Sequence, residues 1–349
     1  MKQWSNRKRN ATVLIVLSVL LLLCMFASFF IGRYAVSSPI TVVRVLLSKV
    51  FPIQQTWTDA EAAIILNVRL PRILLACLVG LALAAAGVTY QGVFLNPMAS
   101  PNVLGASQAA AFGAALAILL GLNRVKIGFF SCAGTTLFAF LAGLAAVALV
   151  YVVGQRAPGK GIVNLILAGI MVSSLFSAGT SFIKLIADTE NQLPAITYWM
   201  MGSLSDAKLE QAGFLLLVIV AAGVPLMILR WRINLLCLGD EETRTLGVRP
   251  TVVRLFSVVC ATLLTAGAIS VSGMIGWVGL VIPHLSRKLV GNDNRILFPT
   301  TALFGALFLL VVDDVSRTLL VTEIPIGILT AFIGCPFFLY LIMRKEQAA

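Results

Sequence analysis

Long apolar runs separated by short polar connections form the dominant pattern along the chain. Runs of ~20 residues are typical of helices that cross a bilayer. We expect ten spans, at about residues 11–31, 67–90, 103–121, 127–153, 162–186, 210–229, 252–271, 275–290, 298–317 and 325–343. The pattern therefore predicts an all-α polytopic membrane protein, in which residues 1–349 form a single transmembrane domain.

The second span is rich in small residues, with Gly80, Ala84 and Val88 four positions apart. Small side chains at this spacing let helix backbones approach closely, which is how apolar helices associate in lipid. We therefore expect this helix in the interior of a bundle. Residues 94–105, FLNPMASPNVLG, contain two prolines, and proline cannot continue a helix. They predict a sharp reversal of the chain.

The connection between the sixth and seventh spans is the most polar interruption of the apolar pattern. Residues 235–248 read LLCLGDEETRTLGV. Charged residues make up only 11% of the chain, so a cluster of them between two long apolar runs indicates a function. If the chain has ten spans and its N-terminus is in the cytoplasm, this segment lies on the cytoplasmic side of the membrane.

Composition agrees with a membrane protein. Of the 349 residues 59% are hydrophobic and the mean hydropathy is +0.99, whereas soluble domains are ~45–50% apolar. The formal net charge is +12, but no basic stripe with interleaved aromatics is present, so binding of nucleic acid is not expected. The six cysteines are widely scattered, and no pair has metal-ligand or redox spacing.

The N-terminal charges predict the orientation. Lys2, Arg7, Lys8 and Arg9 precede the first run, which exceeds the ~7–15 apolar residues of a signal peptide, so a retained first helix is expected. Ten spans then place both termini in the cytoplasm. The loops on the two sides of the membrane contain nearly equal numbers of basic residues. Only the two basic termini give the cytoplasmic side an excess. Arginines on the outer side therefore need another role.

Three features resemble chemical sites without their full complement of residues. Residues 154–161, GQRAPGKG, lack the hydroxyl residue after the lysine and the preceding strand of a phosphate-binding loop, so a tight basic turn is expected. His284 is the only histidine, which disfavours a metal site and histidine-based catalysis. The third feature is the acidic pair Asp313 and Asp314.

Asp313 and Asp314 lie near the end of the ninth span, and carboxylates inside membrane helices are candidates for proton relay. Arg317 follows four residues after the first and three after the second, so local neutralisation is available. A structural or docking role is therefore favoured. A proton-coupled secondary transporter remains the alternative from another functional class.

Several segments together resemble the FecCD-type permeases, the membrane subunits of ABC importers for iron chelates, haem and cobalamin. The resemblance runs from Arg69 to the C-terminus, with Met98 and Trp277 in place of the usual leucine and phenylalanine. The segments are residues 69–105, RLPRILLACLVGLALAAAGVTYQGVFLNPMASPNVLG; residues 235–248; residues 272–293, SGMIGWVGLVIPHLSRKLVGND; and residues 311–342, VVDDVSRTLLVTEIPIGILTAFIGCPFFLYLI. Glu61 to Ala63 spell the EAA of another importer class, but they are expected outside and no glycine follows at suitable spacing.

The resemblance implies the ten-helix fold of a type II ABC importer permease, with no catalytic residue, metal or cofactor of its own. Its implied partners are cytoplasmic ATP-binding subunits, an extracellular or periplasmic substrate-binding protein, and a second permease copy, identical or similar. The implied cargo is an iron chelate, with a ferric siderophore preferred. Cobalamin, haem and an oxyanion such as molybdate remain alternatives.

The family motifs also assign three sets of site residues to this chain. The expected ATPase-coupling loop comprises Leu236, Gly239, Asp240, Glu241, Arg244, Leu246 and Gly247, with Gly239 at a turn between short helices and Gly247 at the end of the second. The expected inner gate comprises Asn96, Pro97 and Met98. Arg69, Arg72 and Arg317 are expected to face outward and to bind carboxylates of the substrate-binding protein.

Overall fold

The structure is a computed structural model that describes residues 2–32, 38–49, 51–100, 104–122, 126–127, 132–156 and 162–346. It is helical throughout, apart from an antiparallel pairing of β1 (Lys126–Ile127) with β2 (Cys132–Ala133). The all-α prediction is therefore confirmed. The helices are α1 (Lys2–Ser28), α2 (Pro39–Leu47), α3 (Asp59–Ala63), α4 (Leu70–Val93), α5 (Ala106–Leu119), α6 (Gly134–Arg156), α7 (Ile162–Ile186), α8 (Gln192–Met201), α9 (Leu209–Leu235), α10 (Asp240–Thr245), α11 (Pro250–Ser272), α12 (Val278–Val290), α13 (Asn294–Thr318) and α14 (Ile326–Glu346).

A helix is present at each of the ten expected spans, but the helices differ in length. Seven in the described part of the chain are long and apolar enough to cross a membrane. α5 has 14 residues and α12 has 13, which at 1.5 Å per residue gives about 20 Å against a hydrocarbon core of about 30 Å. The count of ten membrane crossings therefore stays a prediction.

α4 forms the centre of the bundle, as its small residues predicted. It continues the short helix α3 through a π-helical segment, Ile64–Arg69, and it packs against α9, α11, α12 and α13. A Cβ added at Gly80 would lie 2.2 Å from the carbonyl oxygen of Gly305 on α13, and one at Gly87 would lie 2.0 Å from that of Gly279 on α12. These backbones are in direct contact, so no larger residue fits at the crossings.

Apolar side chains also cover much of the perimeter. Only 11% of the apolar window of α1 and 28% of that of α7 is buried, whereas 83% is buried in the window that includes α4. In water such a surface would aggregate, but in a bilayer it is matched to the acyl chains. α1, α7 and α9 are therefore the helices most available to lipid or to another membrane subunit.

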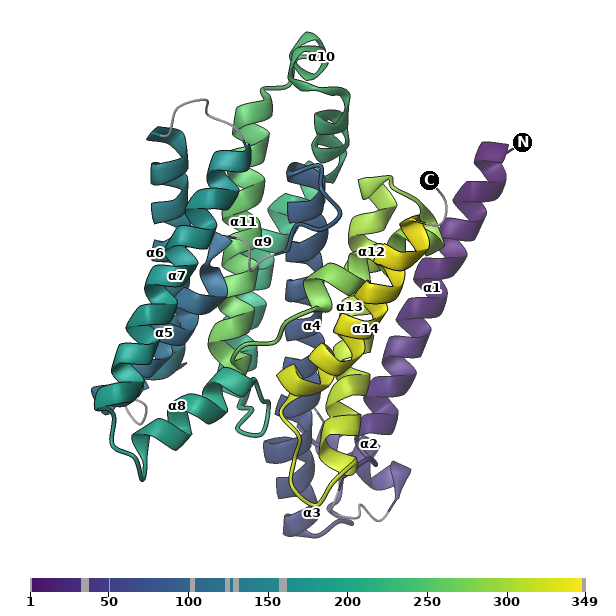
Figure 1. Cartoon of the computed structure of the whole chain (residues 1–349). Coiled ribbons are helices and arrows are strands. Elements are labelled where there is room, and N and C mark those ends of the chain that lie inside the picture. Colours follow the sequence, from purple (N-terminus) through teal and green to yellow (C-terminus); the bar gives the residue numbers. More distant parts are fainter. Residues whose placement is uncertain are drawn as a thin grey trace.

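The two ends of the bundle differ in character (Figure 1). α10 projects beyond the bundle at one end, where the first residues of α1 and the last turns of α14 also lie. α2, α3 and α8 lie at the opposite end. We call these the α10 end and the α3 end. The first residues of α1, the last turns of α14 and the polar segment 235–248 thus lie at the same end, which is the arrangement that an even number of crossings predicts.

Candidate functional site

The candidate site begins with the polar segment at the α10 end, whose shape depends on two glycines. A short 3₁₀ helix, Leu236–Leu238, is followed by Gly239 at φ 102° and ψ 164°, and then by α10. Gly247 follows α10 at φ 79°. Residues with a side chain adopt such positive φ values only with strain, so glycine permits both changes of direction. Both glycines lie where the sequence placed a turn and a helix end.

A buried threonine, Thr243, attaches α10 to the end of α9. It is fully buried, and its hydroxyl lies 2.7 Å from the carbonyl oxygen of Leu235 and 2.6 Å from that of Gly239. The hydroxyl thereby ties α10 to the end of α9 and satisfies carbonyls that the helix ends leave open. Sequence reasoning missed Thr243. The only available signal was a threonine flanked by charged residues, which does not reveal burial.

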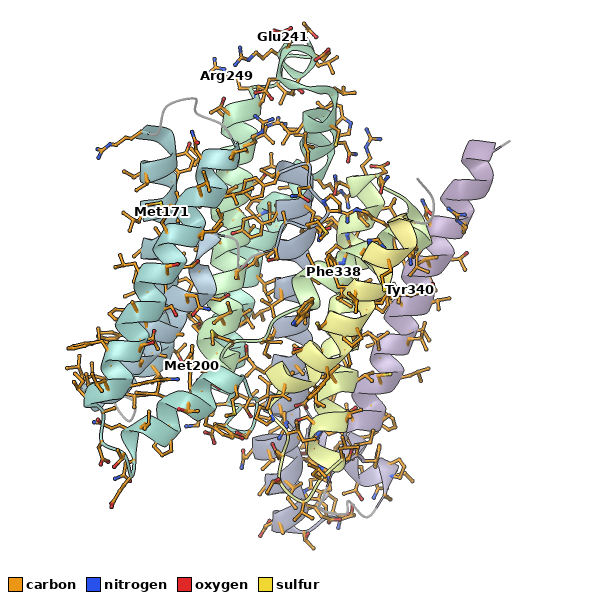
Figure 2. The ribbon with its side chains drawn as sticks, viewed as in Figure 1. Met171, Met200, Glu241, Arg249, Phe338 and Tyr340 are labelled. Carbon is orange, nitrogen blue, oxygen red and sulfur yellow. The ribbon has the colours of Figure 1, made fainter. Side chains whose placement is uncertain are left out.

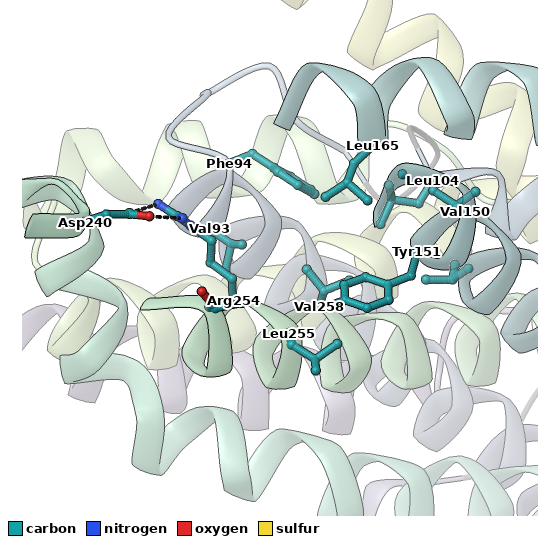
Figure 3. Close-up of a pocket in the computed structure, with 13 residues that line it drawn as sticks. Val93, Phe94, Leu104, Val150, Tyr151, Leu165, Asp240, Arg254, Leu255 and Val258 are labelled. Carbon is teal, nitrogen blue, oxygen red and sulfur yellow. Dashed lines mark hydrogen bonds and ion pairs between the residues drawn. The ribbon is translucent and has the colours of Figure 1, made fainter. Parts of the chain in front are cut away.

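Asp240 connects α10 to the membrane-embedded part of the protein. Its carboxylate accepts two hydrogen bonds from Arg254 on α11, at 2.6 and 3.0 Å, in a bidentate ion pair (Figure 3). These bonds lower the pKa of Asp240 below its ordinary value. Planar guanidinium–carboxylate pairs fix orientation as well as distance. α10 is therefore held to α11 in a defined direction rather than suspended on a loose loop.

The outer face of the segment is mixed in character. Glu241, Arg244 and Gly247 are exposed, and Leu246 is 57% exposed. Leu238, which sequence reasoning did not select, is 53% exposed on the other side of the turn. We call Leu238, Glu241, Arg244 and Leu246 the α10 face. It presents two leucines beside charged groups at the tip of the molecule, where no lipid is expected.

Two residues of the expected coupling loop, Leu236 and Asp240, lie outside the α10 face. Leu236 is completely buried, because the 3₁₀ turn directs it into the core beneath α10. Asp240 is partly exposed, but its carboxylate is occupied by Arg254. Leu236 thus supports the α10 face from inside, and Asp240 attaches it to α11. The role of the segment in coupling stays a prediction.

A cavity of about 420 Å³ lies behind α10 (Figure 3). Its walls are mainly apolar and come from α4, α6, α7 and α11, and the Asp240–Arg254 pair closes one end. Phe94, at the end of α4, and Tyr151, on α6, both line the cavity. The cavity therefore adjoins the ion pair that joins α10 to α11.

The expected inner gate lies at this same end, directly after α4. Asn96 accepts a hydrogen bond on its side-chain oxygen from the backbone N–H of Met98 at 2.8 Å, which is a local turn. Leu95 has a positive φ of 51°, and Met98 is 47% exposed. Pro97 is also exposed. The predicted reversal is present between Val93 and Ala106, although residues 101–103 lie outside the described part of the chain.

The three arginines expected to face outward are all buried, at 4–6% exposure. Arg69 and Arg72 lie at the start of α4, which continues α3, and Arg317 lies in the last turn of α13. Arg72 chelates Asp313 with Nε at 3.0 Å and reaches Glu323 with Nη1 at 2.9 Å. Arg317 pairs with Asp314 and with Ser28 of α1. Direct presentation of these guanidiniums at the surface, as the sequence suggested, is therefore not what the structure shows. The sequence separates Arg72 from Asp313 by 241 positions, so no local pattern indicates the pair.

The same ion pairs account for the acidic residues of the ninth span. Asp313 is fully buried between Arg72, at 2.9 Å, and Arg317, at 3.5 Å. Asp314 accepts a hydrogen bond from Ser28 at 2.6 Å in addition to its pair with Arg317. Both carboxylates are thus held by partners within the protein. This arrangement favours the structural interpretation over the proton relay.

The remaining sequence features are His284, the Glu61 segment and the loop at residues 154–161. His284 packs edge-on against Phe337 on α14, with 6.2 Å between ring centroids. Glu61 completes a capping box with Thr58 at the α3 end, far from α10. Of residues 154–161, positions 157–161 lie outside the described residues. Among the described residues, no group of three histidine, cysteine, aspartate or glutamate side chains could hold a metal ion.

Comparison with known proteins gives consistent results. The profile of the FecCD transport family matches residues 20–344. The chain is 39% identical to the molybdate import system permease protein MolB of Haemophilus influenzae, over 96% of each chain. It is 39% identical to a probable iron chelatin transport system permease protein of Helicobacter pylori, over 81% of this chain and 83% of that one. A solved metal-chelate type ABC transporter in an inward-facing conformation superimposes with a TM-score of 0.83 at 38% identity, covering 96% of this chain and 99% of that chain.

Arg254→Gln should loosen α10 without unfolding the bundle. A partly exposed ion pair is worth about 0.5–1 kcal/mol, so amide hydrogen exchange in residues 240–246 should accelerate about two- to fivefold. Mass spectrometry of the exchanging full-length protein measures this rate. Arg249→Gln, at an exposed arginine beside the segment, is the matched control and should leave the rate unchanged.

The effect of pH follows from the lowered pKa of Asp240. A group whose pKa is depressed in the folded state stabilises that state above its unfolded pKa, about 3.9, and loses this contribution as the pH falls through the folded pKa. The difference in exchange between Arg254→Gln and the unsubstituted protein should therefore be constant from pH 5 to pH 8. If the difference disappeared within that range, the Asp240–Arg254 ion pair would not be what holds α10 to α11.

Arg72→Gln should destabilise the protein far more strongly, because Asp313 would keep a buried charge with only the longer Arg317 contact. Removal of one partner of a buried pair costs about 3–5 kcal/mol. Thermal unfolding in detergent measures the loss. Arg44→Gln removes an exposed arginine whose side chain binds only Thr56 among the described residues, and it should shift the midpoint little. Equal midpoints for the two variants would refute a supporting role for Arg72.

Proposed function

The chain belongs to the FecCD transport family and is the permease of an ABC importer, and we propose on this premise that it carries a ferric chelate into the cell. ATP hydrolysis takes place in separate subunits of such importers. The permease itself must therefore receive mechanical work at one surface and convert it into movement of its helices. The observation that carries this proposal is the α10 face, fastened to α11 by the Asp240–Arg254 pair.

The α10 face has the features that docking of an ATP-binding subunit requires. It projects beyond the bundle, and it offers exposed leucines beside Glu241 and Arg244 (Figure 1). Apolar groups at the centre of an interface supply affinity, while charged groups around them fix the orientation. We infer that this end faces the cytoplasm, together with both termini. A push on α10 would then reach α11 through Asp240 and Arg254.

A substrate-binding protein would dock at the α3 end in this orientation. Glu323 is the accessible member of the buried charge cluster, with 28% of its side chain exposed, and it occupies Arg72. A carboxylate of a docked binding protein could replace Glu323 on Arg72. The arginines Arg69, Arg72 and Arg317 would then act on docking from beneath the surface. This proposal retains their predicted partner but changes the manner of contact.

A second permease copy would cover the exposed apolar surface of α7, α8 and α14. Figure 2 shows Met171, Met200, Phe338 and Tyr340 on these helices, and Met171 is 69% exposed. A groove of about 620 Å³ lies between α8 and α14 and is lined by Met200, Met201, Phe332 and Cys335 among others. These exposed apolar side chains support a partner of the same fold, because the translocation pathway of an importer requires walls on every side.

The cargo has two candidates. The sequence favours an iron chelate, and a relative from Helicobacter pylori is described as an iron chelatin permease. The likeness to the molybdate permease of Haemophilus influenzae covers more of both chains and favours an oxyanion. The substrate-binding protein selects the cargo in such systems, so the permease wall need only be permissive.

Gly239→Val should uncouple the importer. A side chain at φ 102° is strained, and its Cβ would lie 2.8 Å from the carboxylate of Glu242, so the entry to α10 must change. In proteoliposomes with the ATP-binding subunits, ATPase stimulation by the loaded binding protein should fall at least tenfold. Gly121→Val is the matched control, because Gly121 also has a positive φ, of 70°, with open space around it. Undiminished stimulation in Gly239→Val would overturn the coupling role.

Uptake measurements decide the cargo. Proteoliposomes containing the importer and its co-encoded binding protein should accumulate an iron-labelled siderophore in an ATP-dependent manner and should not accumulate labelled molybdate. The reverse result would replace the iron chelate by the oxyanion while leaving the importer assignment intact. Uptake that persisted without the ATP-binding subunits and collapsed with an uncoupler would contradict the importer mechanism itself.

A further inference from the structure

An open groove of about 580 Å³ lies between the end of α9 and the start of α13, apart from the α10 face. Its lining divides into two halves. Val224, Met227 and Ile228 form an apolar wall, whereas Arg230, Trp231 and Arg295 form a basic and aromatic rim. The importer mechanism proposed above uses none of these side chains.

Hydrogen bonds of two asparagines join the two helices that form the groove, α9 and α13. The side-chain oxygen of Asn234, near the end of α9, accepts hydrogen bonds from the backbone N–H and side-chain amide of Asn294 at 2.9 and 2.8 Å. The Asn234 amide donates to Asp293 at 2.7 Å. Asp293 in turn caps α13 through the backbone N–H of Arg295. The rim is therefore built on a fixed junction, and its position does not depend on a loop.

The sequence places this junction at a membrane boundary. On α9 an uninterrupted apolar stretch, residues 212–229, ends directly at Arg230, Trp231 and Arg232. On α13 Arg295 precedes the apolar stretch that begins with Ile296. Tryptophan and arginine at the ends of membrane helices are typical of the headgroup region. The apolar wall therefore lies at the depth of acyl chains and the rim at the depth of phosphates.

The rim carries two guanidiniums, while the nearby Asp293 carboxylate is bonded to Asn234 and to the backbone of Arg295. In the described part of the chain no ion pair joins Arg230 or Arg295 to a carboxylate; Arg230 donates instead to the sulfur of Met227 at 3.2 Å. The Arg295 guanidinium lies over the Trp231 ring, 5.7 Å from its centroid. This stacking orients Arg295 while leaving hydrogen-bond donors available to an anion.

We propose that this groove is a binding site for an anionic phospholipid. The phosphate lies between Arg230 and Arg295, and an acyl chain follows the wall formed by Val224 and Ile228. An anionic phospholipid fits both halves of the groove. Its phosphate matches the basic rim at headgroup depth, and its acyl chain matches the apolar wall at the depth of the hydrocarbon. Ile228 is 75% exposed and Val224 is 52% exposed, which an acidic protein segment or a free phosphate would leave uncovered.

Native mass spectrometry of the full-length permease tests the site. The protein is released from detergent with phosphatidylglycerol or phosphatidylcholine at equal concentration. The expected result is at least fivefold greater retention of phosphatidylglycerol, lost in the double variant Arg230→Gln, Arg295→Gln. Arg249→Gln, which removes an exposed arginine outside the groove, should retain phosphatidylglycerol fully. Thermal unfolding of each variant shows whether a loss of lipid reflects a loss of folding.

Further arms of the experiment separate the possible ligands. Ile228→Gln keeps the charge of the rim and should reduce retention of phosphatidylglycerol, whereas a free anion would be insensitive to it. Excess inorganic phosphate should not displace the lipid. The proposal is overturned by equal retention of the two lipids, by undiminished retention in the folded double variant, or by complete displacement by phosphate.

Discussion

Direct contact between helix backbones at the centre of the bundle determines where every other element can lie. Gly80 of α4 meets Gly305 of α13, and Gly87 meets Gly279 of α12. Inside a bilayer, burial of apolar groups from water cannot drive helices together, so close van der Waals contact and internal polar bonds must do so. α4 is accordingly almost completely buried, and the helices that exchange contacts with lipid or partners are arranged around it.

Two charged clusters at opposite ends of the molecule build on this centre. At one end Arg254 holds Asp240, so α10 is fixed to α11, which packs along α4. At the other end Arg72 of α4 holds Asp313 of α13 and Glu323 of the connection before α14. Both clusters are thus attached to helices of the central packing: the first to α11, which packs on α4, and the second to α4 itself and to α13. Such an arrangement suits a permease that must relate events on the two sides of a membrane.

The sequence predicted those features that depend on local pattern. Apolar runs indicated the helices, the spacing of small residues indicated the buried α4, and Gly239 marked a turn that the structure contains. It could not predict contacts between distant positions. Arg254 follows Asp240 by 14 residues, and Asp313 follows Arg72 by 241, so both ion pairs arise from the packing of helices. For the same reason the burial of Leu236 and Thr243 was not foreseen, since short polar segments do not reveal which face is covered.

Crosslinking from the α10 face tests the central claim most directly. A photoreactive amino acid replacing Leu246, which is 57% exposed, should crosslink to the ATP-binding subunit in membranes that contain the assembled importer. The same group replacing Val321, 89% exposed in the connection between α13 and α14, should give no such product. The account predicts a crosslink from position 246 alone. Absence of that product, or equal products from both positions, would contradict α10 as the surface where the permease receives work.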